Sequence, residues 1–362
     1  MLEKNYLEYI KKTVEFYTDK EKKYLVRELI EQGIACENES AYKQQCINGF
    51  QTIDISGKNL NDKLLACISG NKATVKFLEE WEFVKDYKYS SLFSCKNFDD
   101  ILAKARNVAI LIDCCENEYL SSNIIGQPVG YEDKERVFLK FDLAFSAFNP
   151  LTSEELLLKY PVLAVFHKAY KIIEIRFDVL KKVFLSDKKS QTIYLDILNQ
   201  VVAYFKESFE CELEPFDLEY LINVCKNDSS VKLIAQYMRL ASGGNAQLEV
   251  GNNQEYVLPF LGELRALINE NQAILDNIPD FKEALEQFMY EMEEMSDYPW
   301  IELLWEKEIK TRNIRVKIIF RYRDSSYCLI QHYSSNVLIG MERMNNVVKY
   351  IVDNRIDDKQ TN

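Results

Sequence analysis

The sequence predicts an α+β fold, in which a mostly helical N-terminal region is followed by an α+β domain with a mixed or antiparallel sheet covered by helices. Apolar residues recur at helical spacing before residue 100, whereas they alternate with polar residues in several segments after residue 136. Only 11 glycines and 7 prolines interrupt the 362 residues, which favours long elements. A single hydrophobic core usually stops growing at about 250 to 300 residues. The chain is longer than this, so we expect two domains, residues 1–130 and 131–362.

The first domain is expected to be helical because its apolar residues fall on helical stripes. Tyr6–Tyr17 and Lys20–Ile30 each carry such a stripe. Asn61–Val84 repeats the pattern with a break near Gly70. The apolar run Val108–Asp113 is typical of a buried strand and closes this region.

The second domain is expected to begin with strands, after a boundary at the turn-forming stretch Ser121–Glu135. Val137–Leu143 alternates apolar and polar residues, which predicts a strand with one face toward water. A capping-box pattern predicts a short helix over Thr152–Tyr160, ended by the proline that follows. Val162–His167 and Lys171–Asp178 then predict a β-hairpin.

The rest of the chain is expected to alternate helices and strands. The elements predicted are a helix at Thr192–Phe209, a strand at Leu233–Ala241, a helix at Phe281–Met295, a hairpin of Arg315–Arg323 with Tyr327–Tyr333, and a closing helix at 340–352. In the helix at Phe281–Met295, helical spacing places Phe281 and Phe288 inward and the glutamates outward.

Composition indicates a folded cytoplasmic protein. Hydrophobic residues make up 47% of the chain, enough for a substantial core. The first residues are charged where a secretory signal needs an apolar stretch, and no apolar run has the length of a membrane span. The nine cysteines form an odd set without a CxxC pair, as expected of free thiols in a reducing compartment.

The strongest charge pattern lies in the segment RVKIIFRYR. At strand periodicity, Arg315, Lys317, Arg321 and Arg323 share one face, and apolar and aromatic residues share the other. Like charges in one row repel each other unless an anion neutralises them. The row therefore predicts an anionic partner, most simply nucleic acid. The alternative is that carboxylates of neighbouring strands, such as Glu174 and Asp178, neutralise the row. The net charge of −12 disfavours a protein that coats DNA but permits a local basic face.

A second hypothesis is a divalent-metal nuclease. Asp142 and Glu174 are expected on adjacent strands, where their carboxylates could hold Mg²⁺. Residues 136–178 in this respect resemble the PD-(D/E)xK nuclease family. The lysine that this family has two residues after the glutamate is replaced by Arg176, which cannot act as a base.

Other motifs favour structural roles. His167 and His332 are the only histidines, too few for a zinc site together with scattered cysteines. Ser242–Asn245 has a glycine pair typical of a hairpin turn rather than of a phosphate loop. The adjacent Cys114 and Cys115 precede Glu116, and neighbouring carboxylates keep thiols unreactive.

Three functions therefore compete. The leading one is a non-catalytic interaction protein that presents its basic strand to nucleic acid or to an acidic protein surface. The others are the nuclease, which alone would require a cofactor, Mg²⁺, and a structural subunit of a larger complex. The sequence predicts no membrane partner, and it leaves both hetero- and homo-oligomers open.

Overall fold

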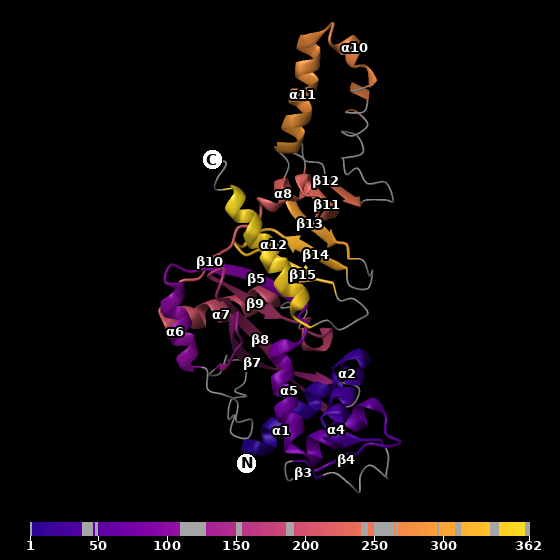
Figure 1. Cartoon of the computed structure of the whole chain (residues 1–362), viewed down its shortest axis with the longest axis vertical. Coiled ribbons are helices and arrows are strands. Elements are labelled where there is room, and N and C mark those ends of the chain that lie inside the picture. The colour runs from indigo at the N-terminus through magenta and orange to yellow at the C-terminus, as the bar shows by residue number, and fades with distance from the viewer. Residues whose placement is uncertain are drawn as a thin grey trace. The chain divides into compact units, whose positions relative to one another are not determined.

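The fold is α+β, with helices and a large antiparallel sheet (Figure 1). It was obtained as a computed structural model, which describes residues 2–37, 46–47, 50–108, 128–149, 154–185, 192–239, 245–249, 264, 267–268, 270–294, 297–307, 313–333 and 340–358. Contacts divide the chain into two compact units, Met1–Tyr87 with Leu92–Glu214, and Lys88–Ser91 with Pro215–Asn362. The boundary that we expect after residue 130 separates two domains that fold independently. That division into domains stays a prediction.

The first unit begins with four helices, α1 (Leu2–Glu15), α2 (Asp19–Glu31), α4 (Leu60–Gly70) and α5 (Lys72–Val84). Thr18 caps α2, and its capping box with Glu21 satisfies backbone amides at the helix start. Asn71 ends α4 and caps α5 by accepting a hydrogen bond from the amide of Ala73, which confirms the break predicted near Gly70. Short strands lie beside these helices: β1 (Ala35–Cys36), β2 (Cys46–Ile47), β3 (Phe50–Gln51) and β4 (Ile53–Asp54).

The sheet of the first unit is antiparallel, in the order β9-β8-β7-β6. Its strands are β6 (Val129–Glu132), β7 (Arg136–Asn149), β8 (Glu154–His167) and β9 (Ile172–Phe177). The helix expected over Thr152–Tyr160 is wrong, because Glu154–Tyr160 belongs to β8 and pairs with β7 along its whole length. Long-range pairing outweighs the local capping signal there, while residues 150–153 lie outside the described part.

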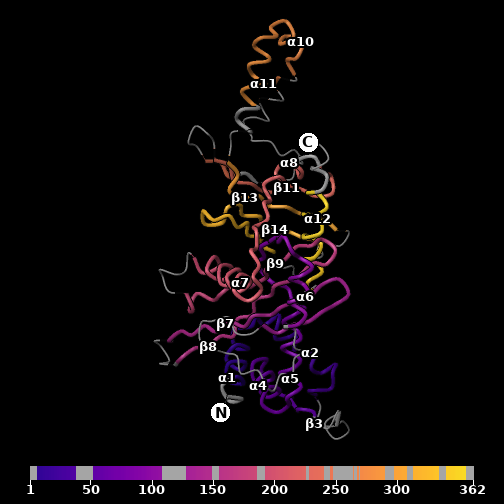
Figure 2. The backbone as a smooth tube through the Cα atoms, turned by 90° about the vertical axis from the view of Figure 1, so that its left-hand side faces the viewer, coloured from indigo at the N-terminus to yellow at the C-terminus, as the bar shows by residue number. Residues whose placement is uncertain are grey.

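The two faces of this sheet carry different side chains. One face is apolar and packs on α7 (Ile193–Phe209) and α6 (Phe98–Val108), where rings of Phe141 and Tyr204 lie 5.0 Å apart and those of Phe166 and Phe205 5.8 Å apart. Figure 2 shows α7 on one side of β7 and β8, with α1, α4 and α5 on the other. The second face, toward α1 and α5, carries the charged residues of the strands. Two elements complete this part, β5 (Tyr89–Ser94) and a 3₁₀ turn (Lys182–Phe184).

The second unit has an antiparallel sheet in the order β12-β11-β13-β14-β15, followed by the first residues of β5. Its strands are β11 (Lys232–Arg239), β12 (Asn245–Glu249), β13 (Asp297–Trp305), β14 (Ile314–Ile319) and β15 (Leu329–His332), while β10 (Glu214–Pro215) pairs with β5. The predicted hairpin is confirmed as β14 and β15, which pair from Val316↔His332 to Ile319↔Leu329. The expected strand Val108–Asp113 is described only at Val108, the last residue of α6.

Helices α8 (Leu221–Asn227) and α12 (Glu342–Asp358) cover one face of this second sheet. The rings of Trp305 on β13 and Tyr350 on α12 are in edge contact at 5.1 Å. Val316 and Ile318 are buried toward this side, and Val347 and Ile351 of α12 are buried too. The opposite face of the sheet, which includes Arg315 and Lys317, is only partly buried.

A helical hairpin follows β12, formed by residues leading into α10 (Gln272–Leu275) and by α11 (Pro279–Glu294). Its small core contains Ile268 and Met289, with Leu264, Leu275 and Leu285 packed against them. The prediction that Phe281 and Phe288 face inward is wrong, since their side chains are 55% and 47% exposed. Within the described residues, no helix combines the length and apolar character needed to cross a bilayer.

Candidate functional site

The basic row predicted on one strand is divided by the structure. Arg315 and Lys317 lie on β14 and point to its partly buried face, as expected. The strand ends at Ile319, so Arg321 and Arg323 lie in the turn that leads to β15, and a single row of four cations does not form. Both arginines have left-handed backbone, with φ of 43° and 54°, which ends strand alternation.

Carboxylates neutralise part of this charge, as the alternative interpretation predicted, but Glu174 and Asp178 are not among them, since they bond Arg176 and Lys85. Arg315 Nε and Nη2 donate to Glu302 Oε2 at 3.0 and 2.5 Å, from the neighbouring strand β13. Arg321 Nε donates to Glu219 Oε1 at 2.8 Å, and its Nη2 lies 3.4 Å from Asp297 Oδ1. Glu302 is buried, so its bond to Arg315 is the better shielded of these pairs.

Aromatic rings accompany the cations on the same sheet face. The Nζ of Lys317 lies 3.3 Å from the ring centre of Trp300 on β13, whose ring in turn stacks on that of Tyr237 at 6.2 Å and 22°. The Arg315 guanidinium lies 4.7 Å from the ring centre of Tyr333. We call Tyr237, Trp300, Arg315, Lys317 and Tyr333 the aromatic–cation face.

Burial and neighbouring charges shift the pKa values of two residues of the aromatic–cation face. Burial lowers the pKa of Lys317 from its usual value, and Arg315 adds to the effect while Glu302 opposes it. Burial raises the pKa of Tyr333 to about 12, helped by the hydrogen bond that its hydroxyl donates to Glu302 Oε1 at 2.8 Å. Burial therefore weakens the hold of Lys317 on its proton, while Tyr333 stays un-ionised at neutral pH.

Asp142 and Glu174 do not form the acidic pair expected of a nuclease. Strand β8 lies between β7 and β9, with Asp142 opposite Pro161 and Glu174 opposite Val165. The two carboxylates are thus one strand apart and offset by four residues, about 13 Å along the sheet. In the described part of the chain, no three His, Cys, Asp or Glu residues converge as metal ligands.

Glu174 and Arg176 belong instead to a buried triad with His167. Glu174 Oε2 accepts a hydrogen bond from Arg176 Nη2 at 2.6 Å and lies 2.9 Å from His167 Nε2. Burial acts to raise the pKa of Glu174, but Arg176 and His167 outweigh it and hold the pKa well below its usual range. Burial lowers the pKa of His167, which is therefore neutral at pH 7 and donates from Nε2.

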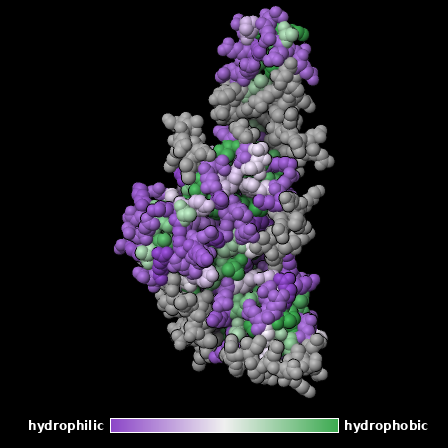
Figure 3. Space-filling view, viewed as in Figure 1, coloured by the Kyte–Doolittle hydropathy of each residue, from purple (hydrophilic) through white to green (hydrophobic). Residues whose placement is uncertain are grey.

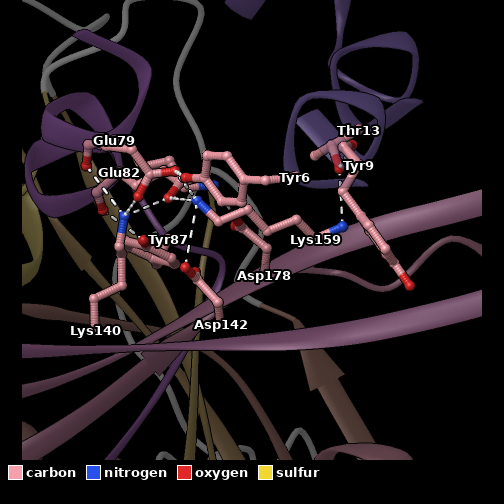
Figure 4. Close-up of polar contacts among 11 residues, drawn as sticks. Tyr6, Tyr9, Thr13, Glu79, Glu82, Tyr87, Lys140, Asp142, Lys159 and Asp178 are labelled. Carbon is pink, nitrogen blue, oxygen red and sulfur yellow. Dashed lines mark hydrogen bonds and ion pairs between the residues drawn. The ribbon is translucent and has the colours of Figure 1, made fainter. Parts of the chain in front are cut away.

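A larger buried charge cluster lies between α5 and the sheet of the first unit (Figure 4). Lys140 on β7 donates to both Glu79 and Glu82 of α5, the second at 2.7 Å. Lys159 on β8 donates to the same two glutamates and lies 3.5 Å from Asp142. Glu79 also accepts from the hydroxyl of Tyr6 on α1, so the cluster joins two helices to two strands.

The cluster is ionised at neutral pH. Burial acts against charge on Glu79, yet Lys140 and Lys159 keep the pKa of Glu79 well below its usual range. The glutamates and Asp142 in return raise the pKa of Lys159 well above its usual value, against the effect of burial. Burial raises the pKa of Asp142 to about 6 in spite of both lysines, so Asp142 is ionised above that pH.

This cluster corrects the expectation that one face of Val137–Leu143 meets water. Lys140 is 1% exposed, and α5 covers the polar face of the strand. Sequence reasoning missed Glu79 and Glu82 because carboxylates three residues apart on a helix are typical of a solvated surface. Lys140 and Lys159 are buried together with their partners. This arrangement is typical of a cluster that holds helices and strands together rather than of a reaction centre.

The functional side chains thus form two separate sets. The first unit holds a buried charge cluster, and the second unit holds the partly exposed aromatic–cation face. Trp300, Tyr237 and Tyr333 were missed as site residues, although their aromatic character was visible, because their alignment depends on strand register. No known protein family, curated protein or solved structure matches this chain.

Proposed function

We propose that this protein is a non-catalytic interaction protein that binds nucleic acid through the aromatic–cation face. The observation that carries the proposal is the pairing of Lys317 with Trp300, beside Tyr237, on a partly exposed sheet face. Sheets with aromatic side chains on one face and helices on the other are a common platform for single strands. Each base stacked on an aromatic ring contributes about 1 to 3 kcal/mol.

Lys317 and Trp300 have different roles in the proposed complex. Trp300 offers a ring to a base, and Lys317, on its flexible four-carbon stem, moves from the ring to a phosphate. Arg315 positions Tyr333 and shares its charge with Glu302. The protein is acidic as a whole, so attraction is local, and stacking supplies most of the affinity.

The number of cations that contact phosphates sets how steeply the binding affinity falls with salt concentration. Single-strand binding loses affinity with a log–log slope of about −0.7 for each phosphate contacted. With Lys317 alone at a phosphate, the slope is about −0.7, whereas the four-cation row of the sequence interpretation gives about −2.8. A shallow slope therefore favours the aromatic–cation face over the row.

The test is titration of the protein into a dye-labelled thymidine oligonucleotide, a labelled mixed-sequence RNA and a labelled duplex, followed by fluorescence anisotropy across a salt series. We expect Trp300→Ala and Lys317→Glu to weaken single-strand binding by about tenfold each. Arg323→Glu makes the same charge change outside the face and should leave affinity within about twofold. Equal loss in Lys317→Glu and Arg323→Glu, or absence of binding at low salt, contradicts the proposal.

The same experiment with and without Mg²⁺, analysed on a gel, separates a binding protein from a nuclease. The separation of Asp142 from Glu174 gives the nuclease no support. A cytoplasmic location is part of the proposal, and it is supported by the free thiols at Cys36, Cys67, Cys95, Cys211, Cys225 and Cys328.

A further inference from the structure

The helical hairpin of α10 and α11 carries an apolar surface that its own core leaves uncovered. Ile274, Ile278, Phe281 and Phe288 are 61%, 51%, 55% and 47% exposed. We call these four side chains the apolar ridge. In Figure 3, green hydrophobic surface lies among purple hydrophilic surface at the helices labelled α10 and α11 in Figure 1. Single exposed apolar residues are ordinary, but four in one short segment indicate a binding surface.

The spacing of the ridge indicates the shape of its partner. Ile274 lies on α10 and Ile278 in the turn that precedes α11, while on α11 Phe281, Leu285 and Phe288 follow steps of four and three residues. This is the repeat by which a helix presents a narrow seam to another helix. Leu285 is half-buried against Met289, so it anchors the ridge to the hairpin core while the phenylalanines on either side point outward.

The charge of the hairpin indicates the chemistry of that partner. Residues 264–294 contain eight acidic residues, Glu270, Asp276, Asp280, Glu283, Glu286, Glu291, Glu293 and Glu294, against Arg265 and Lys282. Lys282 is itself bonded to Asp276 at 2.9 Å. Two copies of such a hairpin repel each other, whereas a helix with lysine or arginine beside its apolar seam is attracted.

We propose that the apolar ridge docks a basic amphipathic helix of another protein. Phe281 and Phe288 insert between the apolar side chains of that helix, and the acidic residues of α11 contact its cations. This is the helix-against-helix mode of recognition, with aromatic anchors at the centre and charges at the rim. It is independent of the aromatic–cation face, which lies on strands of the sheet.

The test uses full-length protein and two labelled three-heptad peptides that share leucine at positions a and d. One has lysine and the other glutamate at positions e and g. We expect the lysine peptide to bind, and the Phe281→Ser, Phe288→Ser variant to bind it at least about tenfold more weakly. Val183→Ser, which changes an apolar residue 43% exposed elsewhere, is the matched control and should bind like wild type.

A second variant tests the charge. Glu283→Lys, Glu286→Lys should weaken the lysine peptide and strengthen the glutamate peptide, and both residues are exposed, so folding is unaffected. Helical content and melting temperature are compared for all variants. Equal affinity for the two peptides, no binding of either, or equal loss in Val183→Ser overturns the proposal. Self-association that disappears in the phenylalanine variant overturns it in favour of a second copy.

Discussion

Replacement of Lys159 by methionine removes one of the two cations in the buried charge cluster. Its side chain is 1% exposed and contacts Glu79, Glu82 and Asp142. After the change, Lys140 alone faces the buried carboxylates of Glu79 and Glu82 and the partly buried one of Asp142. Removal of one partner from a buried ion pair costs about 3 to 5 kcal/mol, because the remaining charge is buried without compensation.

Urea unfolding followed by circular dichroism measures this loss. With an m-value of about 2 kcal/mol per molar urea, a loss of 4 kcal/mol lowers the midpoint by about 2 M. Lys76→Met on α5, the helix that carries Glu79 and Glu82, is the control. Lys76 is 62% exposed and lies 3.9 Å from Glu80, so its loss should change the midpoint by less than about 0.3 M. A Lys159→Met midpoint within 0.5 M of wild type, by the same approximate conversion, refutes the reasoning.

Three further changes test other parts of the first unit. Because burial raises the pKa of Asp142 to about 6, its ionisation destabilises the fold progressively from about pH 4 to pH 6, by about 3 kcal/mol in all. Asp142→Asn should therefore gain stability over wild type at pH 7.5 but not at pH 4, and a urea midpoint difference independent of pH contradicts this. Thr18→Ala removes the capping box of α2 and should cost about 1 kcal/mol in thermal unfolding, whereas Thr18→Asp should cost less. Phe205→Ala empties a fully buried site beside Phe166 and should cost about 3 to 5 kcal/mol; a loss below 1 kcal/mol would show that the site collapses.

Local patterns predicted the fold class and several elements. The β14–β15 hairpin was found because alternation and a polar turn both lie within about twenty residues. The helical spacing of α5 and the break near Gly70 were visible for the same reason. The segment Glu154–Tyr160 was misassigned, since its strand state depends on β7, and a capping motif carries no information about a partner strand.

The candidate site was less predictable because it depends on contacts between distant residues. Alternation at Lys140 and Asp142 correctly indicated a strand. Alternation does not show whether the polar face of that strand meets water or a helix that carries carboxylates. The row from Arg315 to Arg323 assumed that strand periodicity continues, whereas left-handed backbone at Arg321 ends it. Trp300 reaches Lys317 only through the register of β13 with β14.

The buried charge cluster also bears on the order in which the chain is synthesised. Helix α5 leaves the ribosome with Glu79 and Glu82, yet Lys159 follows Glu79 by 80 residues. At about 5 to 20 residues per second, the wait is about 4 to 16 seconds. Until then the glutamates keep that side of α5 hydrated, so the nascent helices resist premature burial against the wrong surface. We therefore expect α5 to become buried against this sheet only after the β7–β8 hairpin, with Lys140 and Lys159, has been synthesised.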